Sequence, residues 1–534
     1  MKSIVLSLLL TTVLPGVIQD QTGSVEGTIV NAYTGEPIRD IQVSIDSGHT
    51  GTTDRSGHFR LTKIPPGEHR LNVSQHDFIL NPGGFTFGSN TDAGVLKLQP
   101  RQQIRDVQLE MVPSGTISGH VWNSNGTPAA NAKVQLLQYR YSAFGELSLA
   151  FIPTGPLASN DKGEYRQWGI PPGQYFVLGS PPPAAGNPAS GNGPIPTFYP
   201  AARVLERSTA ITVGRGQEVD HVDISLLSAQ RNSMTFNLVL PAGVQTVTGK
   251  LQLIPDSIDS SGGDMSGCII WMCVTAARTQ QTIFNVPAGR YTVVTTANNS
   301  SGGEEYSGRA EIYIGDGPAD PITIYSTAVE SADISGHVRF ADTGEVLKIA
   351  SAPFDLQSST RRYPSPRIPA GADPSLSFVV KHVAFGEYQF GAYPPPGAYL
   401  ADVLQGNRSI LNGVLKVSEV SREPLDVVLA RDGGTIRGIV RSVRGSPIAF
   451  AQAVLVSPSQ HRLQTQTIRA DYSGRFSFEN VSPGNYKLYS WLTLPLNAWQ
   501  NAEFMKKYDA MGTPVTVEPQ KTTEELIVTR ILDE

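Results

Sequence analysis

Short stretches in which apolar and polar residues alternate run through the whole chain, separated by turns rich in glycine and proline. Residues 41–45 read Ile-Gln-Val-Ser-Ile, and residues 132–136 read Ala-Lys-Val-Gln-Leu. A period of two places every second side chain on the same face of an extended strand, so each stretch predicts a β-strand with one buried face. The pattern therefore predicts an all-β chain with few helices.

The same order of strands and turns returns five times, about once every 100 residues. The copies that match best have an opening strand such as Gly-Thr-Ile-Arg-Gly-Ile-Val at residues 434–440, then a Gly-x-Pro turn, an Asp-x-x-Gly hairpin and a Pro-Gly turn. Each copy reads as about seven short strands with no helix between them, which is typical of two packed sheets with Greek-key connections. We therefore predict a tandem array of about five Greek-key β-sandwiches.

Domain boundaries are expected where a closing strand ends and the next opening strand begins. They place the five sandwich domains at residues 21–112, 113–227, 228–329, 330–430 and 431–534, and the third copy diverges most from the others. Two segments rich in proline and glycine, residues 181–196 and 393–397, are expected to be loops inserted within the second and fourth copies.

Asp54, Ser56 and His58 are the residue types of a hydrolase triad, and they lie within five positions of the chain. Alignment of the copies argues against a triad, because Ser56 has no partner in the second copy and His58 is replaced by Glu164 and by Arg475. What persists is an acidic residue, a glycine and an aromatic residue, which is what a hairpin turn needs. We therefore interpret these positions as turns.

The residues expected to form the two recurring turns are acidic residues that bond to backbone amides and glycines able to take positive φ. They are Asp54, Gly57, Gly67, Asp161, Gly163, Gly173, Gly289, Gly386, Asp471, Gly474 and Gly484.

The linked pattern of G-x-I-x-G-x-V, G-x-P, D-x-x-G-x-F and I/V-x-P-G-x-Y resembles the carboxypeptidase regulatory-like domain, a transthyretin-like sandwich grouped near carbohydrate-binding folds. The resemblance covers nearly the whole chain after residue 20, and the first, second and fifth copies match best. It implies a domain that is not itself catalytic and that accompanies peptidases, outer-membrane receptors and carbohydrate-active proteins of bacteria. Fold alone does not fix function.

Export is predicted by the first 20 residues, which resemble a signal peptide. Lys2 precedes an apolar run, residues 4–14, that is too short to span a bilayer, and Pro15 and Gly16 then break the run. The alternative is a buried first strand. No later stretch is apolar for long enough to predict a membrane helix, so the mature chain is expected to be periplasmic, at the cell surface or secreted.

Charge and motifs narrow the function classes. The 534 residues carry a net charge of −5 with no basic stripe, which argues against nucleic-acid binding. The chain contains no HExxH, HxxE, GxSxG, P-loop or Rossmann motif. We therefore predict no catalytic residues, no cofactor and no metal site. His120 and His337 occupy equivalent positions in their copies and are interpreted as strand side chains.

The two cysteines, Cys268 and Cys273, leave several alternatives open. In an exported chain they can form a disulfide, but five positions along one strand put them on opposite faces, so a bond requires a bulge or turn between them. Two buried free thiols are the other main alternative. A metal or redox role is the third.

Aromatic residues offer the remaining route to a binding function, because exposed rings stack on sugars. The densest group is Tyr489, Trp491 and Trp499 in the fifth copy. These are the candidate ligand-stacking residues, and core packing is the competing interpretation. Other candidate rings are Trp122, Trp168 and Tyr199.

The function that these observations predict is that of a non-catalytic, exported binding or spacer protein of the cell envelope, with a polysaccharide or an envelope protein as its partner. The alternatives are a carbohydrate-binding protein and an accessory subunit of an envelope peptidase or outer-membrane receptor system. An enzyme is the weakest alternative. The sequence predicts neither the ligand nor the oligomeric state.

Overall fold

A computed structural model describes residues 21–532, except 47, 81–89, 143–144, 153–156, 183–190, 243, 245–246, 256–269, 276–278, 300–303, 316, 318–319, 348–352, 359–361, 364–377, 412–413, 420–422, 458–464 and 492–494. The predicted signal peptide and Cys268 lie outside the described residues. Only the backbone of Cys273 is described, in a strand that pairs it with Lys250, so the disulfide and the two free thiols stay open as alternatives.

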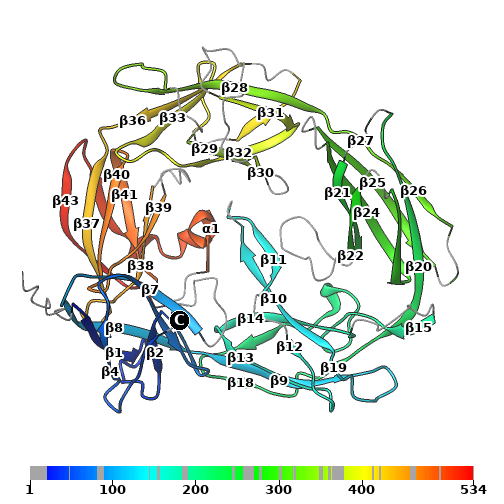
Figure 1. The fold of residues 1–534 in the computed structure, drawn as a ribbon, viewed down its shortest axis with the longest axis horizontal. Helices are drawn as coiled ribbons and strands as arrows, with labels where there is room; N and C mark the ends of the chain where they lie inside the picture. Colours follow the sequence, from blue (N-terminus) through cyan, green and yellow to red (C-terminus); the bar gives the residue numbers. More distant parts are fainter. Residues whose placement is uncertain are drawn as a thin grey trace, which may run out of the picture.

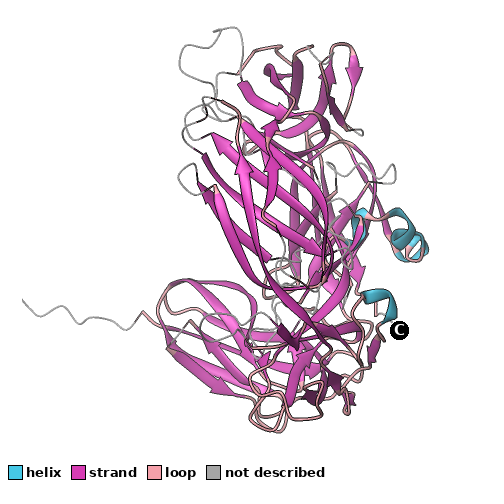
Figure 2. Ribbon diagram, turned by 90° about the vertical axis from the view of Figure 1, so that its right-hand side faces the viewer, coloured by secondary structure: helices cyan, strands magenta, loops and turns pink. Residues whose placement is uncertain are grey.

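The described chain is nearly all β, and its ten sheets pack in pairs as sandwiches. Figure 1 shows the sandwiches following one another around a ring, from the blue first one to the orange and red last one. The side view in Figure 2 shows strands throughout and only a few helical turns. The prediction of an all-β chain is confirmed.

The first sandwich shows the plan of the others. One sheet has the order β4 (His58–Ile64), β1 (Gly23–Asn31), β8 (Gln103–Pro113) and β6 (Phe78–Leu80), and the other has β3 (His49–Thr52), β2 (Gln42–Ile45), β5 (Gly67–Ser74) and β7 (Asn90–Leu98). The opening strand β1 pairs antiparallel with β4 and parallel with the closing strand β8. The alternating residues predicted to face inward, such as Ile41, Val43 and Ile45, are fully buried between the sheets.

The second sandwich repeats this plan with shorter closing strands. Its sheets contain β13 (Glu164–Ile170), β9 (Gly115–Trp122), β18 (Glu218–Val219) and β19 (Ile224–Ser225), and then β11 (Leu147–Phe151), β10 (Lys133–Tyr141), β12 (Leu157–Ala158), β14 (Gly173–Ser180), β16 (Thr197–Phe198) and β17 (Ile211–Val213). A short 3-10 helix, η1, covers Leu205–Arg207. The β10–β11 hairpin points into the ring (Figure 1).

The third sandwich takes one strand from the chain of the second. Its sheets contain β15 (Gly191–Pro194), β20 (Ser228–Val239), β23 (Gln280–Pro287) and β26 (Ile322–Tyr325), and then β22 (Ile270–Thr275), β21 (Val247–Pro255), β24 (Gly289–Asn299), β25 (Glu305–Ile314) and β27 (Thr327–Ala328). Strand β15 belongs to the segment 181–196 that was expected to be an inserted loop, and it pairs antiparallel with β20. This part of the loop prediction is wrong, because backbone pairing with the next sandwich makes residues 191–194 extended.

The fourth and fifth sandwiches complete the ring. The fourth contains β31 (Phe378–Ala384), β28 (Ser331–Phe340), β36 (Leu425–Ala430), β33 (Tyr399–Gln405) and β34 (Arg408–Ser409), and then β30 (Arg362–Tyr363), β29 (Phe354–Gln357), β32 (Gly386–Ala392) and β35 (Leu415–Val417). The fifth contains β40 (Arg475–Val481), β37 (Gly434–Arg441) and β43 (Thr522–Thr529), and then β39 (Gln466–Arg469), β38 (Gln452–Val456), β41 (Gly484–Tyr489) and β42 (Thr513–Val517). Short helices η3 (Ala498–Gln500), α1 (Ala502–Lys506) and η4 (Asp509–Met511) precede β42.

Junctions between sandwiches are short. One to three residues separate β8 from β9, β19 from β20, β27 from β28 and β36 from β37. The domain boundaries derived from the sequence, near residues 113, 228, 330 and 431, stay predictions of where the chain divides into folding units.

The hairpin at residues 54–58 is a turn held by its aspartate. Asp54 Oδ1 accepts hydrogen bonds from the backbone N of Ser56 at 2.8 Å and of His58 at 3.0 Å, and from Ser56 Oγ at 2.6 Å. These bonds, led by the one from Ser56, lower the pKa of Asp54. The His58 ring lies 3.7 Å from Glu26 instead of contacting Ser56 Oγ. The three residues are therefore arranged as a turn.

In the equivalent turn of the second sandwich, the residue predicted to accept the backbone hydrogen bonds is wrong. Asn160, not Asp161, accepts the backbone N–H groups of Lys162 and Glu164, both at 2.9 Å. The spacing explains the error, since Asn160 lies three positions before Gly163 just as Asp54 lies three positions before Gly57. An asparagine carbonyl accepts the same bonds as a carboxylate.

In four of the sandwiches, a tyrosine hydroxyl closes the second recurring turn. The hydroxyls of Tyr175, Tyr291, Tyr388 and Tyr486 each donate to the backbone carbonyl four residues earlier, at 2.7–2.8 Å. In the first sandwich His69 replaces the tyrosine, and its Nε2 lies 2.7 Å from the Pro65 carbonyl. The glycines of these turns have φ between 143° and 159°, except Gly173, which is not at positive φ. The positive φ predicted for Gly173 in the second copy is therefore wrong.

Substitutions in the first hairpin should separate a turn from a catalytic site. Gly57 has φ +71°, and a Cβ there would lie 2.5 Å from the Ile29 carbonyl oxygen. We expect Gly57→Val to cost about 1–3 kcal/mol through backbone strain, whereas the exposed Ser56→Ala should change stability by less than about 0.5 kcal/mol. Calorimetric unfolding measures both. A larger loss from Ser56→Ala, or a hydrolytic activity that it abolishes, would contradict the turn assignment.

His69 should make the first sandwich sensitive to pH. Its Nδ1 lies 2.6 Å from Asp46 Oδ2, and this hydrogen bond raises the pKa of His69 and lowers that of Asp46. The contribution of His69 to the free energy of unfolding is complete below its ordinary pKa of 6.5 and is lost as pH rises through the raised value. The contribution of Asp46 is complete above its ordinary pKa of 3.8 and is lost as pH falls through the lowered value. The pair therefore stabilises most between these values.

The test compares two substitutions. We expect the melting temperature of the first sandwich to fall as pH rises above 6.5 and through the raised pKa of His69. His69→Tyr should flatten that part of the profile, because tyrosine titrates near pH 10. His58→Gln, at a half-buried histidine of the same sandwich that makes no contact with Asp46, should flatten it less. An equal flattening in both variants would show that the Asp46–His69 pair is not the cause.

Candidate functional site

The three rings named as candidates for ligand stacking or for core packing are buried in the structure. Tyr489, Trp491 and Trp499 are 2–8% exposed and pack in a cluster with Val454 and Met505. The rings of Tyr489 and Trp491 stack on each other, with centroids 4.9 Å apart and planes at 13°. Burial raises the pKa of Tyr489 to about 12. The burial supports the core-packing alternative: Trp499 belongs to η3, and it packs with Tyr489 and Trp491 in one buried cluster.

The fifth sandwich docks on the first through Phe450. This side chain is 5% exposed and belongs to the hydrophobic core of the first sandwich, with Leu71 and Leu96. A Cβ on Gly94 of β7 would lie 2.3 Å from Phe450 Cδ1, so the ring lies directly against that strand. The backbone N of Ala449 donates to the Gln108 carbonyl at 3.0 Å. Two sandwiches that are far apart in sequence therefore share one core.

Phe450 occupies an unusual backbone position for an aromatic residue. It has φ +58°, and the equivalent turn residues of the first two copies are Asp40 at +63° and Asn131 at +57°. Asparagine and aspartate tolerate this left-handed region, whereas a bulky residue there is strained. An aromatic residue at a polar turn position is a signal that the sequence analysis missed. Packing in the first sandwich compensates for the strain.

A buried ion pair lies beside Phe450. Arg530, just after β43, contacts Glu110 of β8, and both side chains are almost fully buried. Burial lowers the pKa of Arg530 to about 9, so the guanidinium stays protonated at neutral pH. Glu110, Arg530 and Trp491 line the same small cavity between the two sandwiches. Nothing in the local sequence pattern marks this pair.

Further contacts tie the first and fifth sandwiches to the second. Arg444 Nη2 donates to the Tyr33 carbonyl at 2.5 Å, and Arg215 of the second sandwich lies 3.8 Å above the Tyr33 ring. Near α1, Asn501 Nδ2 donates to the Gly145 carbonyl at 2.9 Å. The rings of Phe504 and Tyr141 meet edge to face at 5.7 Å. The fifth sandwich therefore contacts both of the first two.

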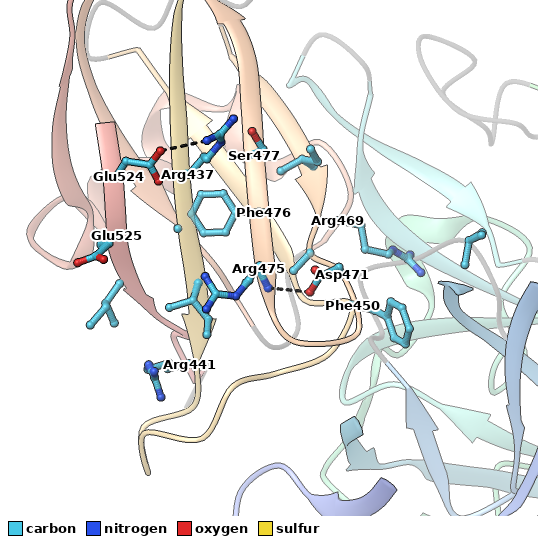
Figure 3. Close-up of a pocket in the computed structure, with 16 residues that line it drawn as sticks. Arg437, Arg441, Phe450, Arg469, Asp471, Arg475, Phe476, Ser477, Glu524 and Glu525 are labelled. Atoms are coloured by element: carbon cyan, nitrogen blue, oxygen red, sulfur yellow. Dashed lines mark hydrogen bonds and ion pairs between the residues drawn. The ribbon is translucent and has the colours of Figure 1, made fainter. Parts of the chain in front are cut away.

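An open groove of about 920 Å³ lies on the outer face of the fifth sandwich, at its seam with the first (Figure 3). Strands β37, β40 and β43 form the floor, and Phe450 with Val95 of β7 forms the wall towards the first sandwich. The side chains of alternate residues point into the groove, because β37 buries Ile436 and Val440 and turns Arg437 outward.

The groove is lined by both signs of charge. Arg437 Nη1 lies 3.0 Å from Glu524 Oε1, as the dashed line in Figure 3 shows. Arg441 Nη1 donates to the Gly445 carbonyl at 2.6 Å. The backbone N of Arg475 donates to Asp471 Oδ1 at 3.0 Å, and its exposed side chain has no carboxylate partner within the described part of the chain. This arrangement can bind polar and charged groups.

The described residues contain no group of three or more histidine, cysteine, aspartate or glutamate side chains placed to hold a metal ion. Among the same residues, no helix has the length and apolar composition needed to cross a bilayer.

Comparisons with solved structures give only distant similarity. The Bacillus anthracis TIE protein aligns over 77% of this chain and 67% of its own, with 11% identity and a TM-score of 0.16. The minor pilin GBS52 of Streptococcus agalactiae aligns over 38% and 95%, with 12% identity and a TM-score of 0.19. BcpA, the major pilin subunit of Bacillus cereus, aligns over 78% and 99%, with 10% identity and a TM-score of 0.12. These scores are too low to carry an argument.

Sequence comparisons are more specific for the first sandwich. A search of curated proteins gives no match. Residues 24–90 match the family model of the carboxypeptidase regulatory-like domain. They span strands β1 to β6 and the beginning of β7, which include both recurring turns. The resemblance inferred from the linked motifs is thus confirmed here, and the chain carries a carboxypeptidase regulatory-like domain in its first sandwich.

Proposed function

We propose that this chain is a non-catalytic, exported binding scaffold of the cell envelope, in which five β-sandwiches are held in a closed array. The observation that carries the proposal is the insertion of Phe450 into the core of the first sandwich. A spacer gains length from units arranged in a line, and a fifth unit that returns to the first gives up that length. A closed array instead fixes binding surfaces relative to one another.

Fixed surfaces favour binding because less conformational freedom is lost when a ligand binds. The groove at the seam is such a surface, since its wall comes from the first sandwich and its floor from the fifth. Export is supported by the signal-like first 20 residues and by the carboxypeptidase regulatory-like domain. A non-catalytic role is supported by the same domain and by the turn geometry of Asp54, Ser56 and His58.

Sugar binding through the rings of the fifth sandwich is no longer part of the proposal, because Tyr489, Trp491 and Trp499 are buried. An extended spacer remains the competing function. Small-angle scattering distinguishes the two, since an extended array has a much larger maximum dimension than a closed one.

Removing the ring at the seam should open the array. Phe450→Ala takes a large aromatic side chain out of a core, which costs about 3–5 kcal/mol, and this loss falls on the contact between the first and fifth sandwiches. We expect the radius of gyration from small-angle scattering to increase. Phe284→Ala, at a ring that is 47% exposed on β23, should leave the scattering unchanged. A wild-type curve that already fits a linear array would contradict the closed scaffold.

Breaking the buried ion pair should destabilise the seam by a different route. Arg530→Met leaves Glu110 buried without its cation, which we expect to cost about 3–5 kcal/mol. Combining it with Glu110→Leu should recover most of that loss, because two apolar residues can replace a buried pair. Arg166→Met breaks an exposed pair with Glu218 and should cost less than about 1 kcal/mol. Calorimetry on the four proteins measures these differences.

The double substitution makes that experiment decisive. If Arg530→Met is as mild as Arg166→Met, the pair does not support the seam. If Glu110→Leu with Arg530→Met is less stable than either single variant, the two residues do not act through one another.

A further inference from the structure

The groove of the fifth sandwich presents arginines and carboxylates together, and this mixture restricts its ligand. We propose that it binds an acidic polysaccharide of the polyuronate type, whose sugar rings carry both carboxylates and hydroxyls. The inference rests on the proposed function and deepens it by naming the ligand class. It is argued from the charge, the pairing and the shape of the groove.

The arginines supply sites for carboxylates. The Arg475 side chain extends from the first residue of β40, is exposed, and has no carboxylate partner among the described residues. Arg441 gives one N–H to the Gly445 carbonyl, which leaves the rest of its guanidinium available in the groove. A guanidinium binds a carboxylate through two parallel hydrogen bonds, which are stronger than bonds between neutral groups.

The carboxylates of the groove supply acceptors for hydroxyl groups. Glu524 is already paired with Arg437, but both side chains are about half exposed, so each keeps free bonding capacity. Asp471 and Glu525 also line the groove. An ionised carboxylate only accepts hydrogen bonds, so it binds the hydroxyl donors that every ring of a sugar polymer carries and that the side chains of poly-glutamate lack. A polyuronate satisfies both kinds of lining group.

The floor carries exposed apolar surface. Ile439 lies on the outward side of β37 with Arg437, whereas Gly438 is buried on the side that faces the core. Ile439 and Ile527 are register partners on adjacent strands, and both line the groove. Their apolar surface suits the C–H faces of sugar rings. The volume lies within the usual range for ligand sites, about 300–1,000 Å³.

Binding of the full-length protein to polygalacturonate tests the proposal, with neutral dextran and poly-glutamate as comparison ligands. We expect polygalacturonate to bind, its affinity to fall as NaCl is raised, and neither comparison ligand to bind comparably. Arg475→Ala should weaken binding about tenfold, because it removes charged hydrogen bonds, and Arg441→Ala should act in the same direction. Arg60→Ala, at an exposed arginine of β4 in the first sandwich, is the matched control and should have no effect.

Three results would overturn the proposal: no binding of polygalacturonate by the folded wild type, equal weakening by Arg60→Ala and Arg475→Ala, or tighter binding of poly-glutamate, which would indicate an acidic peptide instead. Scattering on the same samples keeps this test separate from that of the scaffold. A closed array that does not bind polygalacturonate would refute only the ligand class. A linear array would refute the scaffold whatever the binding result.

Discussion

The packing of Phe450 in the core of the first sandwich is the contact on which the arrangement of this protein depends. The ring lies against Gly94 of β7, and the buried Arg530–Glu110 pair lies beside it. Burial of a large aromatic side chain supplies the favourable energy, and the ion pair adds a geometric requirement, because a buried charge without its partner is costly. Both the ring of sandwiches and the groove at the seam follow from this docking.

Local features of the fold could be predicted from the sequence because they repeat. Alternation marked Ile41, Val43 and Ile45 as buried, and the Asp54 hairpin was identified from what its copies share. Even the one misplaced turn residue was a local error, since Asn160 performs the role assigned to its neighbour. The reason for the tyrosine two positions after the turn glycine in four of the five copies, a hydroxyl that donates to a backbone carbonyl, became clear only from the structure.

Features that join distant segments could not be predicted in this way. Glu110 and Arg530 are separated by four sandwiches of sequence, and no periodic pattern links them. Strand β15 was hidden in a segment rich in glycine and proline, because its pairing depends on the exposed edge of β20 in the next sandwich. Stacking and packing could not be separated for Tyr489 and Trp491 from the sequence, because their burial depends on contacts with Trp499 and Met505 of the short helices that follow. Only Phe450 carried a local signal, as an aromatic residue where two other copies have Asp40 and Asn131.

The shared core also sets an order of events during synthesis. Residues of the first sandwich are made hundreds of residues before Phe450, so the pocket for its ring is exposed to solvent while the rest of the chain is still emerging. Contacts of such large sequence separation form late, and apolar surface left open in the meantime is prone to aggregation. The first sandwich is thus finished last. A chain truncated before the fifth sandwich would leave the apolar pocket of its first sandwich permanently exposed to solvent.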